Sequence, residues 1–208
     1  GTCVSAGRIV WREQAGSRTL AEVSDLQLPG RHNLANALAA CAAASVVGVQ
    51  ADGIRQALRD FRPVDHRLEK VGEAHGVTYI NDSIATSPDR TRVALEAFEG
   101  RVILIAGGHD KGLSFSDLGP VIGNRVSDAV LMGPTADGIA ASIPGDSATR
   151  VHRSGGLAEA TQLAARLAEA GTVVLLSPAS ASYDEFRNFE ERGQAFRSLV
   201  GSVIGGSE

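Results

Sequence analysis

From about residue 64 onward, short apolar runs rich in β-branched residues alternate with segments of helical pattern, and no other feature restricts the fold as much. We expect strands at 77–80, 102–106, 129–132 and 173–176, with a weaker candidate at 150–152. The clearest helical patterns lie at 157–170 and 184–200. Strands that alternate with helices are typical of a parallel sheet covered on both faces. The sequence therefore predicts an α/β domain with a mostly parallel, doubly wound sheet.

The first part of the chain has a different pattern. Two short strands are expected at 8–12 and 19–23, because apolar and β-branched residues flank a polar turn at 14–17. The segment 28–32 contains proline and glycine and is expected to break the chain after the second strand.

Two helices are expected to follow this break. The first is alanine-rich, covers about 33–47 and has Gly48 as its stop signal. The second covers about 52–61 and begins on Asp52, which can cap it. The polar turn at 62–65 contains a helix-stopping proline, so we expect the boundary between two domains there.

Composition excludes several classes of protein. The 208 residues are 43% hydrophobic and 21% charged, which are ordinary globular proportions. A formal net charge of −4 provides no broad positive field for nucleic acid or for an anionic membrane, so neither is an expected partner. No apolar run approaches the roughly 20 residues that span a bilayer.

The N-terminus and the cysteines add two expectations. The chain opens on Gly1 without a methionine or a leader pattern, and we expect it to be a partial sequence. Cys3 and Cys41 have neither metal-ligand spacing nor a disulfide framework, which favours a reducing cytosol. Cys41 lies in an alanine-rich run and is expected to be a small core residue.

Polar or glycine-rich loops follow three of the expected strands. They are NDSIATSP at 81–88, GGHDKG at 107–112 and SPASASYDEF at 177–186. In open α/β sheets, ligands bind beyond the carboxyl ends of the strands. Glycine amides, hydroxyls and a lysine charge all suit an anion. These loops predict a ligand that carries carboxylate or phosphate groups, while the residues alone leave the reaction open.

The loop at 81–88 also has a purely structural interpretation. Ser87 and Pro88 form a good N-cap and first-turn pair, so the loop can simply start a helix. That interpretation leaves Asp82 and Thr86 unexplained, and both stay candidates for ligand binding.

The other two loops have structural alternatives as well. The 107–112 segment can be a flexible turn with a solvated Lys111, and it lacks the spacing of a P-loop. The 177–186 segment can be a serine-rich turn in which Asp184 caps a helix. The free amides at the start of that helix would favour a carboxylate or a phosphate, and the density of hydroxyls favours a binding site.

Two further candidates lie upstream of these loops. Asn33 and Asn36 lie on one face of the expected helix, where an amide can both donate to and accept from an adenine edge. An N-cap role is the alternative for Asn33. Arg67, which follows His66 directly after the boundary, can clamp a nucleotide or pair across a domain interface.

Taken together, five stretches resemble the Mur ligase family and, within it, the members that add D-glutamate. They are LPGRHNLAN at 28–36, HRLE at 66–69, YINDS at 79–83, GGHDKG at 107–112 and LSPASASYDEFRNFEERG at 176–193. The last stretch is long and specific, whereas the His-Asn and His-Arg elements are shared by sibling ligases. The order and spacing of the stretches agree over essentially the whole chain.

The resemblance implies a protein of three domains: a UDP-binding domain, a central ATPase domain and a Rossmann-like C-terminal domain. Residues 1–63 would be the C-terminal part of the central ATPase domain, and residues 64–208 would be the C-terminal domain. The UDP-binding domain, the ATP phosphate loop and most Mg²⁺ ligands would lie outside this sequence. The chain alone would therefore be inactive.

The implied activity is that of a cytoplasmic, ATP-dependent ligase of peptidoglycan precursor synthesis. With ATP and Mg²⁺, the carboxylate of UDP-N-acetylmuramoyl-L-alanine would become an acyl phosphate, and the amine of D-glutamate would attack it to form an amide. These two small molecules are the expected partners, and we expect a monomer. Catalysis would come mainly from positioning and from charge neutralisation.

The resemblance also implies two groups of binding residues in this sequence. The group that would contact the nucleoside end of ATP is Asn36, Arg67 and Asp82. The group that would bind D-glutamate is Thr86 and Lys111 at its α-carboxylate, and Ser182 and the backbone of Phe189 at its side-chain carboxylate. No residue of the chain receives a catalytic or metal-ligand role.

Two positions depart from the family pattern. Ile84 stands where some members carry lysine, so a cationic contact is lost there. His109 stands where an aspartate is common in the glycine loop, which leaves open how this loop contacts the amine or the carboxylate.

Two other functions stay open at this point. The first is a sibling amino-acid ligase, such as an L-alanine- or diaminopimelate-adding enzyme or a folylpolyglutamate synthase. The absence of an Asp-Asn-Pro-Arg motif and the run at 177–184 favour D-glutamate instead. The second is a non-catalytic Rossmann-like binding module, which would lack a glycine-rich phosphate loop upstream.

Overall fold

A computed structural model of the chain describes residues 1–14, 16–27, 30–61 and 64–206, without the side chains of Arg31 and His32. It divides into two compact units, Gly1–Pro63 and Val64–Glu208. The boundary expected at 62–65 includes Arg62 and Pro63, which lie outside the described residues.

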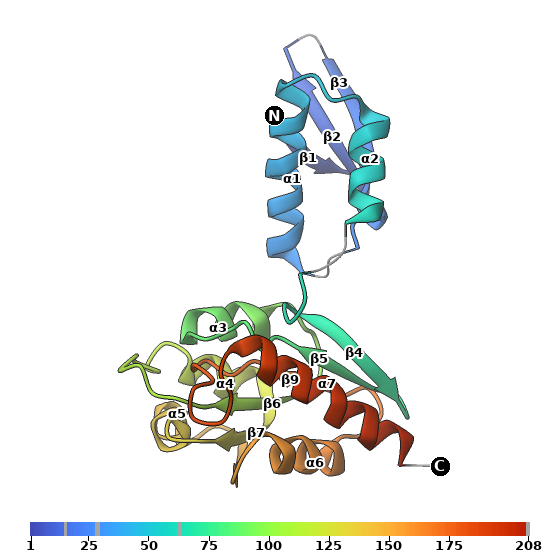
Figure 1. Cartoon of the computed structure of the whole chain (residues 1–208). Coiled ribbons are helices and arrows are strands. Elements are labelled where there is room, and N and C mark those ends of the chain that lie inside the picture. Colours follow the sequence, from blue (N-terminus) through green and yellow to red (C-terminus); the bar gives the residue numbers. More distant parts are fainter. Residues whose placement is uncertain (15, 28–29, 62–63, 207–208) are drawn as a thin grey trace. The chain divides into compact units, whose positions relative to one another are not determined.

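The first unit is a three-stranded antiparallel sheet with two helices (Figure 1). Its elements are β1 (Thr2–Ser5), β2 (Arg8–Glu13), β3 (Gly16–Glu22), the short 3-10 helix η1 (Val23–Asp25), α1 (Arg31–Val46) and α2 (Ala51–Asp60). Ile9, Leu20, Cys41 and Ile54 are buried in its core. The two expected strands are confirmed as β2 and β3, and Cys41 is confirmed as a core residue.

Several details of the first unit differ from the expectations. The strand β1 was not expected, and the strand β3 already includes two residues of the expected turn at 14–17. Ala15 of that turn lies outside the described residues, as do Leu28 and Pro29 of the expected break.

The caps of the two helices also differ. The N-cap of α1 is Gly30, so the N-cap interpretation of Asn33 is wrong, and Asn33 lies buried inside the first turn. The N-cap of α2 is Gln50, whose ψ of 156° is extended, and Asp52 lies inside the first turn instead of capping the helix. A capping residue must precede the helical backbone, and Asp52 does not. Gly48 follows α1 with a φ of 88° and is confirmed as its stop signal.

The second unit is a six-stranded sheet with helices on both faces (Figure 1). Its elements are β4 (Glu69–Ala74), β5 (Val77–Asn81), α3 (Pro88–Glu96), β6 (Val102–Gly107), α4 (Gly119–Arg125), β7 (Val126–Met132), α5 (Ala136–Ser142), β8 (Arg150–Ser154), α6 (Leu157–Leu167), β9 (Val173–Leu176) and α7 (Phe189–Gly205). The strand order is β4-β5-β9-β6-β7-β8, and all pairs are parallel except β4 with β5. The predicted mostly parallel α/β fold is therefore confirmed.

The central strand β6 shows why the sheet is buried on both faces. Leu104 and Ala106 pack in the same cluster as residues of α3, α4 and α5. Ile103 and Ile105, which alternate with them, pack with residues of α6 and α7. Because side chains alternate across a strand, a continuous apolar run such as β6 fills two cores at once.

The edge strand β4 was not expected from the sequence. Its residues are mostly polar or small, and it pairs with β5 through a hairpin whose turn residues His75 and Gly76 have φ values of 51° and 75°. A two-residue turn with both φ values positive suits the twist of a hairpin. Only the pairing with β5 makes this polar segment a strand.

The last helix begins later than expected. A helix was predicted from Asp184, but α7 begins at Phe189 with Asn188 as N-cap. The amides of Glu185 and Phe186 bond to Ser182 O, which closes a turn before the helix. The Oδ1 of Asn188 accepts from Glu191 N over 2.8 Å, so Asn188 caps the helix in place of Asp184.

None of the helices in the described ranges is long and apolar enough to cross a membrane.

Candidate functional site

The three polar loops of the sequence meet at one edge of the sheet. They follow β5, β6 and β9, and β9 lies between the other two strands. The helices α3 and α4, which follow β5 and β6, pack on one face, whereas α7, which follows β9, packs on the other. At the carboxyl ends of these strands, the chain after β9 therefore turns to one face of the sheet, and the chains after β5 and β6 turn to the other. Open α/β sheets bind ligands at such a point.

The glycine loop at 107–112 and the serine loop at 177–186 are joined through their backbones. Gly107 N donates to Pro178 O over 2.8 Å, and His109 N donates to Ala181 O over 3.0 Å. Between them, Gly108 has a φ of 142°, and a Cβ there would overlap Ala181 O. The start of the 107–112 loop is therefore a fixed structure that requires glycine, and not a flexible turn.

Thr135, which follows β7, contacts both the glycine loop and the serine loop. Its Oγ1 accepts from Gly108 N over 3.0 Å and lies 2.9 Å from Ser180 Oγ. These groups are buried, so the Ser180 hydroxyl serves the loop structure. Because Thr135 comes from a third strand end, the sequence offered no signal for it.

Asp82 lies at the end of β5 with 4% of its surface exposed. Its Oδ1 accepts from Leu68 N over 3.2 Å, and its Oδ2 accepts from Ser177 Oγ over 2.8 Å. Burial raises the pKa of Asp82 to about 6, against the lowering effect of these hydrogen bonds and of the Arg67 and Arg90 charges. The pKa of the Asp82 carboxyl thus lies well above its ordinary value of 3.8.

Arg192 of α7 is a buried cation that holds two of the loops, and it is 1% exposed. Its Nε donates to Ser83 Oγ over 3.0 Å, and its Nη2 donates to Ser83 O and Ser180 O over 3.0 and 3.1 Å. Its Nη1 donates to Ala181 O over 3.0 Å. Burial lowers the pKa of Arg192 to about 10, opposed by the charge of Asp184, so it stays charged at neutral pH.

The first turns of α7 dock on the loop after β5. Ser83 Oγ donates to Phe189 O over 2.8 Å, and Asn81 Nδ2 donates to Gly193 O over 3.1 Å. The same Asn81 amide lies 2.9 Å from His66 Nδ1. A Cβ on Gly193 would overlap the His66 ring, so glycine permits this close approach.

The residues expected to bind D-glutamate lie on these loops and at the start of α7. Lys111 is exposed, and its amine forms no ion pair with the part of the chain that the structure describes. The hydroxyls of Thr86 and Ser182 likewise make no hydrogen bond to described residues, and Ser182 is 2% exposed. Phe189 is the first residue of α7, where backbone amides have no partner inside the helix.

The residues expected to contact ATP lie in both units. Arg67 is exposed beside Asp82, and its charge lowers the pKa of that carboxyl. Asn36 is exposed on α1 of the first unit. Asn33, its neighbour on the helix, is buried.

Arg192 is the main site residue that sequence reasoning missed. It lies four residues before Phe196 and eight before Val200, and both of these are fully buried on α7. An arginine on the apolar stripe of a helix is unusual, because a buried charge needs several hydrogen-bond partners. The place of Arg192 on this apolar stripe was therefore the sequence feature that could have identified it as a site residue.

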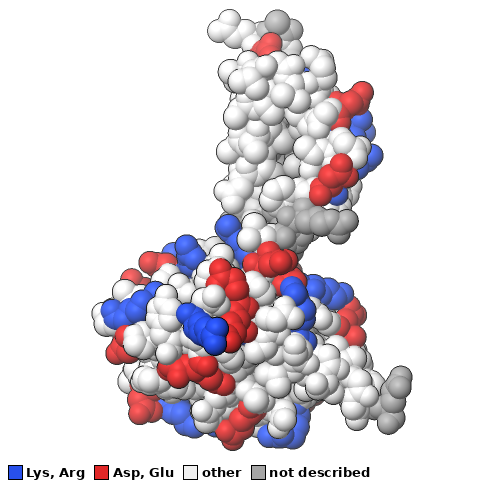
Figure 2. Space-filling view, viewed as in Figure 1, with Lys and Arg blue, Asp and Glu red and all other residues white. Residues whose placement is uncertain are grey.

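The surface of the second unit carries charges of both signs. Figure 2 shows acidic and basic side chains interspersed over the second unit on the face drawn, without a large region of one sign. In the described part of the chain, no group of three or more His, Cys, Asp or Glu side chains could hold a metal ion.

Comparison with known proteins gives two kinds of match. Residues 66–180 match the family model described as "Mur ligase, glutamate ligase domain". A UDP-N-acetylmuramoylalanine--D-glutamate ligase from Acidobacterium capsulatum is 44% identical over 202 residues, which are 96% of this chain and 43% of that protein. An enzyme of the same name from Symbiobacterium thermophilum is 41% identical over 95% of this chain and 44% of its own length. The chain thus spans less than half the length of these relatives.

Solved structures show the same fold at lower identity. UDP-N-acetylmuramate-alanine ligase MurC from Thermotoga maritima superposes with a TM-score of 0.64 at 21% identity, over 85% of this chain and 39% of that one. A pseudomurein peptide ligase type C from Methanothermus fervidus gives a TM-score of 0.68 at 18% identity, over 96% of this chain and 41% of that one.

Proposed function

Because the chain belongs to the Mur ligase family, we propose that it is the C-terminal part of an ATP-dependent ligase that adds D-glutamate to UDP-N-acetylmuramoyl-L-alanine. The observation that carries the proposal is the similarity to relatives named for this reaction, at 44% and 41% identity over nearly the whole chain. The product is an amide in a peptidoglycan precursor. The reaction consumes ATP and proceeds in the cytoplasm, in a monomeric protein.

In this proposal the first unit is the C-terminal part of the central ATPase domain, and the second unit is the Rossmann-like C-terminal domain. The division of the chain after Pro63 supports this assignment, as does the family match within the second unit alone. The remaining length of the relatives would hold the UDP-binding domain and the ATP phosphate loop.

The second unit binds D-glutamate through separate sites for its two carboxylates. Lys111 and Thr86 hold the α-carboxylate, and the Ser182 hydroxyl and the Phe189 amide hold the side-chain carboxylate. Hydrogen bonds from a charged amine or from a helix N-terminus to a carboxylate are among the stronger ones in proteins. The support lies in the arrangement of these groups. They follow strands β5, β6 and β9 at the carboxyl ends of the strands, and none of them forms a hydrogen bond or ion pair with a described residue.

In the second unit, Arg67 and Asp82 contact the nucleoside end of ATP. The ATP contact expected of Asn36, in the first unit, stays a prediction from the sequence. Asp82 can accept a hydrogen bond from a ribose hydroxyl while Ser177 and Leu68 hold its carboxylate in place. ATP supplies the phosphoryl group that activates the carboxylate of the acceptor. Most of the Mg²⁺ ligands are proposed to lie outside this sequence, as the resemblance to the family implies.

The contribution of this chain to catalysis is positioning. A dicarboxylate held at both ends presents its amine in one orientation, and a well-oriented nucleophile gains a large effective concentration. Arg192 acts through other residues, because it fixes the backbone of the loops that carry the anion-binding groups.

The test is phosphate release by the full-length protein that contains this chain. The assay supplies UDP-N-acetylmuramoyl-L-alanine, ATP and Mg²⁺ with one amino acid at a time, and the product is analysed for the new amide. Release that requires D-glutamate is the expected result. Release with L-alanine or diaminopimelate instead would keep the ligase class and overturn the substrate. A folded, ATP-binding protein that releases phosphate with none of them would be a binding module.

A further inference from the structure

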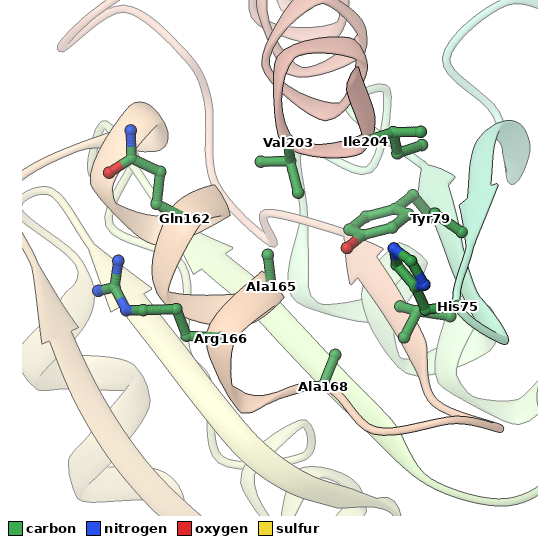
Figure 3. A pocket seen from close by; sticks show the side chains of 10 residues that line it. His75, Tyr79, Gln162, Ala165, Arg166, Ala168, Val203 and Ile204 are labelled. Carbon is green, nitrogen blue, oxygen red and sulfur yellow. The ribbon is translucent and has the colours of Figure 1, made fainter. Parts of the chain in front are cut away.

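A cavity of about 390 Å³ opens on the second unit between α6, α7 and the β4–β5 hairpin (Figure 3). Its walls combine polar and apolar surface, and the apolar part includes Ala165 of α6 together with Val203 and Ile204 of α7. The volume lies within the range of about 300–1,000 Å³ that is common for small-molecule sites.

This cavity is separate from the candidate D-glutamate and ATP site. Val77, which lines it, is the first residue of β5, whereas Asp82 follows the last residue of that strand. Likewise α7 contributes its C-terminal turn to the cavity and its N-terminal residue Phe189 to the other site. The cavity thus lies toward the amino ends of the parallel strands, at the edge opposite the three loops.

Tyr79 gives the cavity a polar group that has no partner among the described residues. The side chain is 4% exposed, and its hydroxyl is directed into the space between α6 and α7 (Figure 3). No described residue accepts or donates a hydrogen bond at this oxygen. Burial raises the pKa of the Tyr79 hydroxyl, so it stays a hydrogen-bond donor at neutral pH. This oxygen is open to solvent through the cavity, so a ligand that enters can take the place of water as its hydrogen-bond partner.

Arg166 places a positive charge on one side of the cavity. Arg166 of α6 is exposed, and its guanidinium forms no ion pair with any residue that the structure describes. Figure 3 shows its side chain extending along the α6 side, away from Tyr79. The imidazole of His75 lies on the opposite side, next to Tyr79. None of the described residues that line the cavity is acidic, so an acidic group near the opening would be attracted by the charge of Arg166 without opposition from a lining carboxylate.

We propose that this cavity is a binding site for a small amphipathic anion. The apolar ring or chain of the ligand packs against Ala165, Val203 and Ile204. A hydrogen-bond acceptor of the ligand meets the Tyr79 hydroxyl, and its acidic group lies at the rim near Arg166. The site is independent of the proposed ligase reaction.

The test uses the full-length protein and the fluorescent probe 8-anilinonaphthalene-1-sulfonate, an aromatic body with one acidic group. Its neutral counterpart, N-phenyl-1-naphthylamine, has the same rings without the sulfonate. Ala165→Phe fills the cavity, and Ala158→Phe makes the same change at an exposed position of the same helix. Tyr79→Phe removes only the hydroxyl, and Arg166→Gln removes the rim charge. Circular dichroism checks that each variant is folded.

The proposal expects saturable binding of the sulfonate probe that is lost in Ala165→Phe and retained in Ala158→Phe. Tyr79→Phe should weaken this binding by about 3- to 10-fold, the usual effect of one hydrogen bond. Arg166→Gln should weaken binding of the sulfonate probe more than binding of the neutral probe.

Each of the following results would overturn the proposal. Equal binding by wild type and by a folded Ala165→Phe variant would place the probe elsewhere. Tighter or equal binding of the neutral probe would exclude an anion. Displacement of the probe by saturating D-glutamate or ATP would show that the cavity is not a separate site. If Ala165→Phe does not fold, unchanged binding in Tyr79→Phe decides against the proposal.

Discussion

Ser177 Oγ donates a hydrogen bond of 2.8 Å to Asp82 Oδ2 and so joins the ends of β9 and β5, two strands that are neighbours in the sheet but far apart in the sequence. Both residues are buried, and the same hydroxyl lies 3.0 Å from Thr91 Oγ1 on α3. The edge that carries the candidate site therefore has a polar interior, held together by side chains of different loops.

The buried carboxyl of Asp82 predicts a stability that falls as pH rises. Burial raises its pKa from 3.8 to about 6, so the folded protein keeps a proton that the unfolded chain has released at intermediate pH. This difference between the folded and unfolded pKa lowers the free energy of unfolding by on the order of 3 kcal/mol once the pH exceeds about 6, and has no effect below about pH 4. Relative to Asp82→Asn, wild type should lose free energy of unfolding over this range. Urea unfolding of both proteins at several pH values measures it, and a constant difference would contradict the prediction.

Lys111→Ala in the full-length protein should raise KM for D-glutamate far more than KM for ATP. Loss of one charged hydrogen bond corresponds to about 10- to 100-fold in KM. Lys70→Ala on β4 is the control, since Lys70 is exposed and its amine pairs with Glu73. Steady-state kinetics with each substrate varied in turn gives the comparison. Equal effects on both KM values would remove the proposed role.

Ser182 and Ser180 should behave differently when each is replaced by alanine. The Ser182 hydroxyl has no hydrogen bond to described residues, so Ser182→Ala should raise KM for D-glutamate with little change in stability. The Ser180 hydroxyl contacts Thr135, so Ser180→Ala should lower the free energy of unfolding by about 1 kcal/mol. Kinetics and denaturant unfolding of both variants separate the two roles, and the reverse pattern would refute them.

Arg192→Lys should destabilise the second unit by about 2–4 kcal/mol, because a lysine amine cannot reach Ser83 and Ala181 together. Arg197→Lys, one turn later on α7 and partly exposed, should cost less than about 1 kcal/mol. Chemical unfolding of both variants gives the two values. Similar values would mean that the buried hydrogen bonds of Arg192 contribute little.

Gly193→Ala should destabilise the protein by about 1–3 kcal/mol, because the added methyl group would overlap the His66 ring and push α7 away from the loop after β5. Gly201→Ala on the same helix has open space around its Cβ and should stabilise by up to about 1 kcal/mol. Opposite signs in thermal unfolding are expected. A stabilising Gly193→Ala would show that the His66 contact is loose.

The regular elements were readable from the sequence where their signals are local. Strands such as β6 are continuous apolar runs, and Gly48 stops α1 as a glycine in the left-handed region should. The strand β4 was not readable, because its polar residues become a strand only through pairing with β5. The sequence predicts a start of α7 at Asp184, but the helix begins later. The residues before it form a turn that closes on Ser182 O, and Asn188 caps the helix. The sequence is compatible with both starts, so it did not distinguish them.

The sequence by itself determined the α/β class of the second unit and the three loops that follow β5, β6 and β9, because apolar periodicity and loop composition are local properties. Only the tertiary structure decided that β9 lies between β5 and β6, which makes the three loops neighbours. It alone also decided that Arg192 and Thr135 hold the loops together and that Tyr79 faces a cavity. Contacts of this kind depend on the order of strands in the sheet, and that order arises from packing between residues distant in the chain.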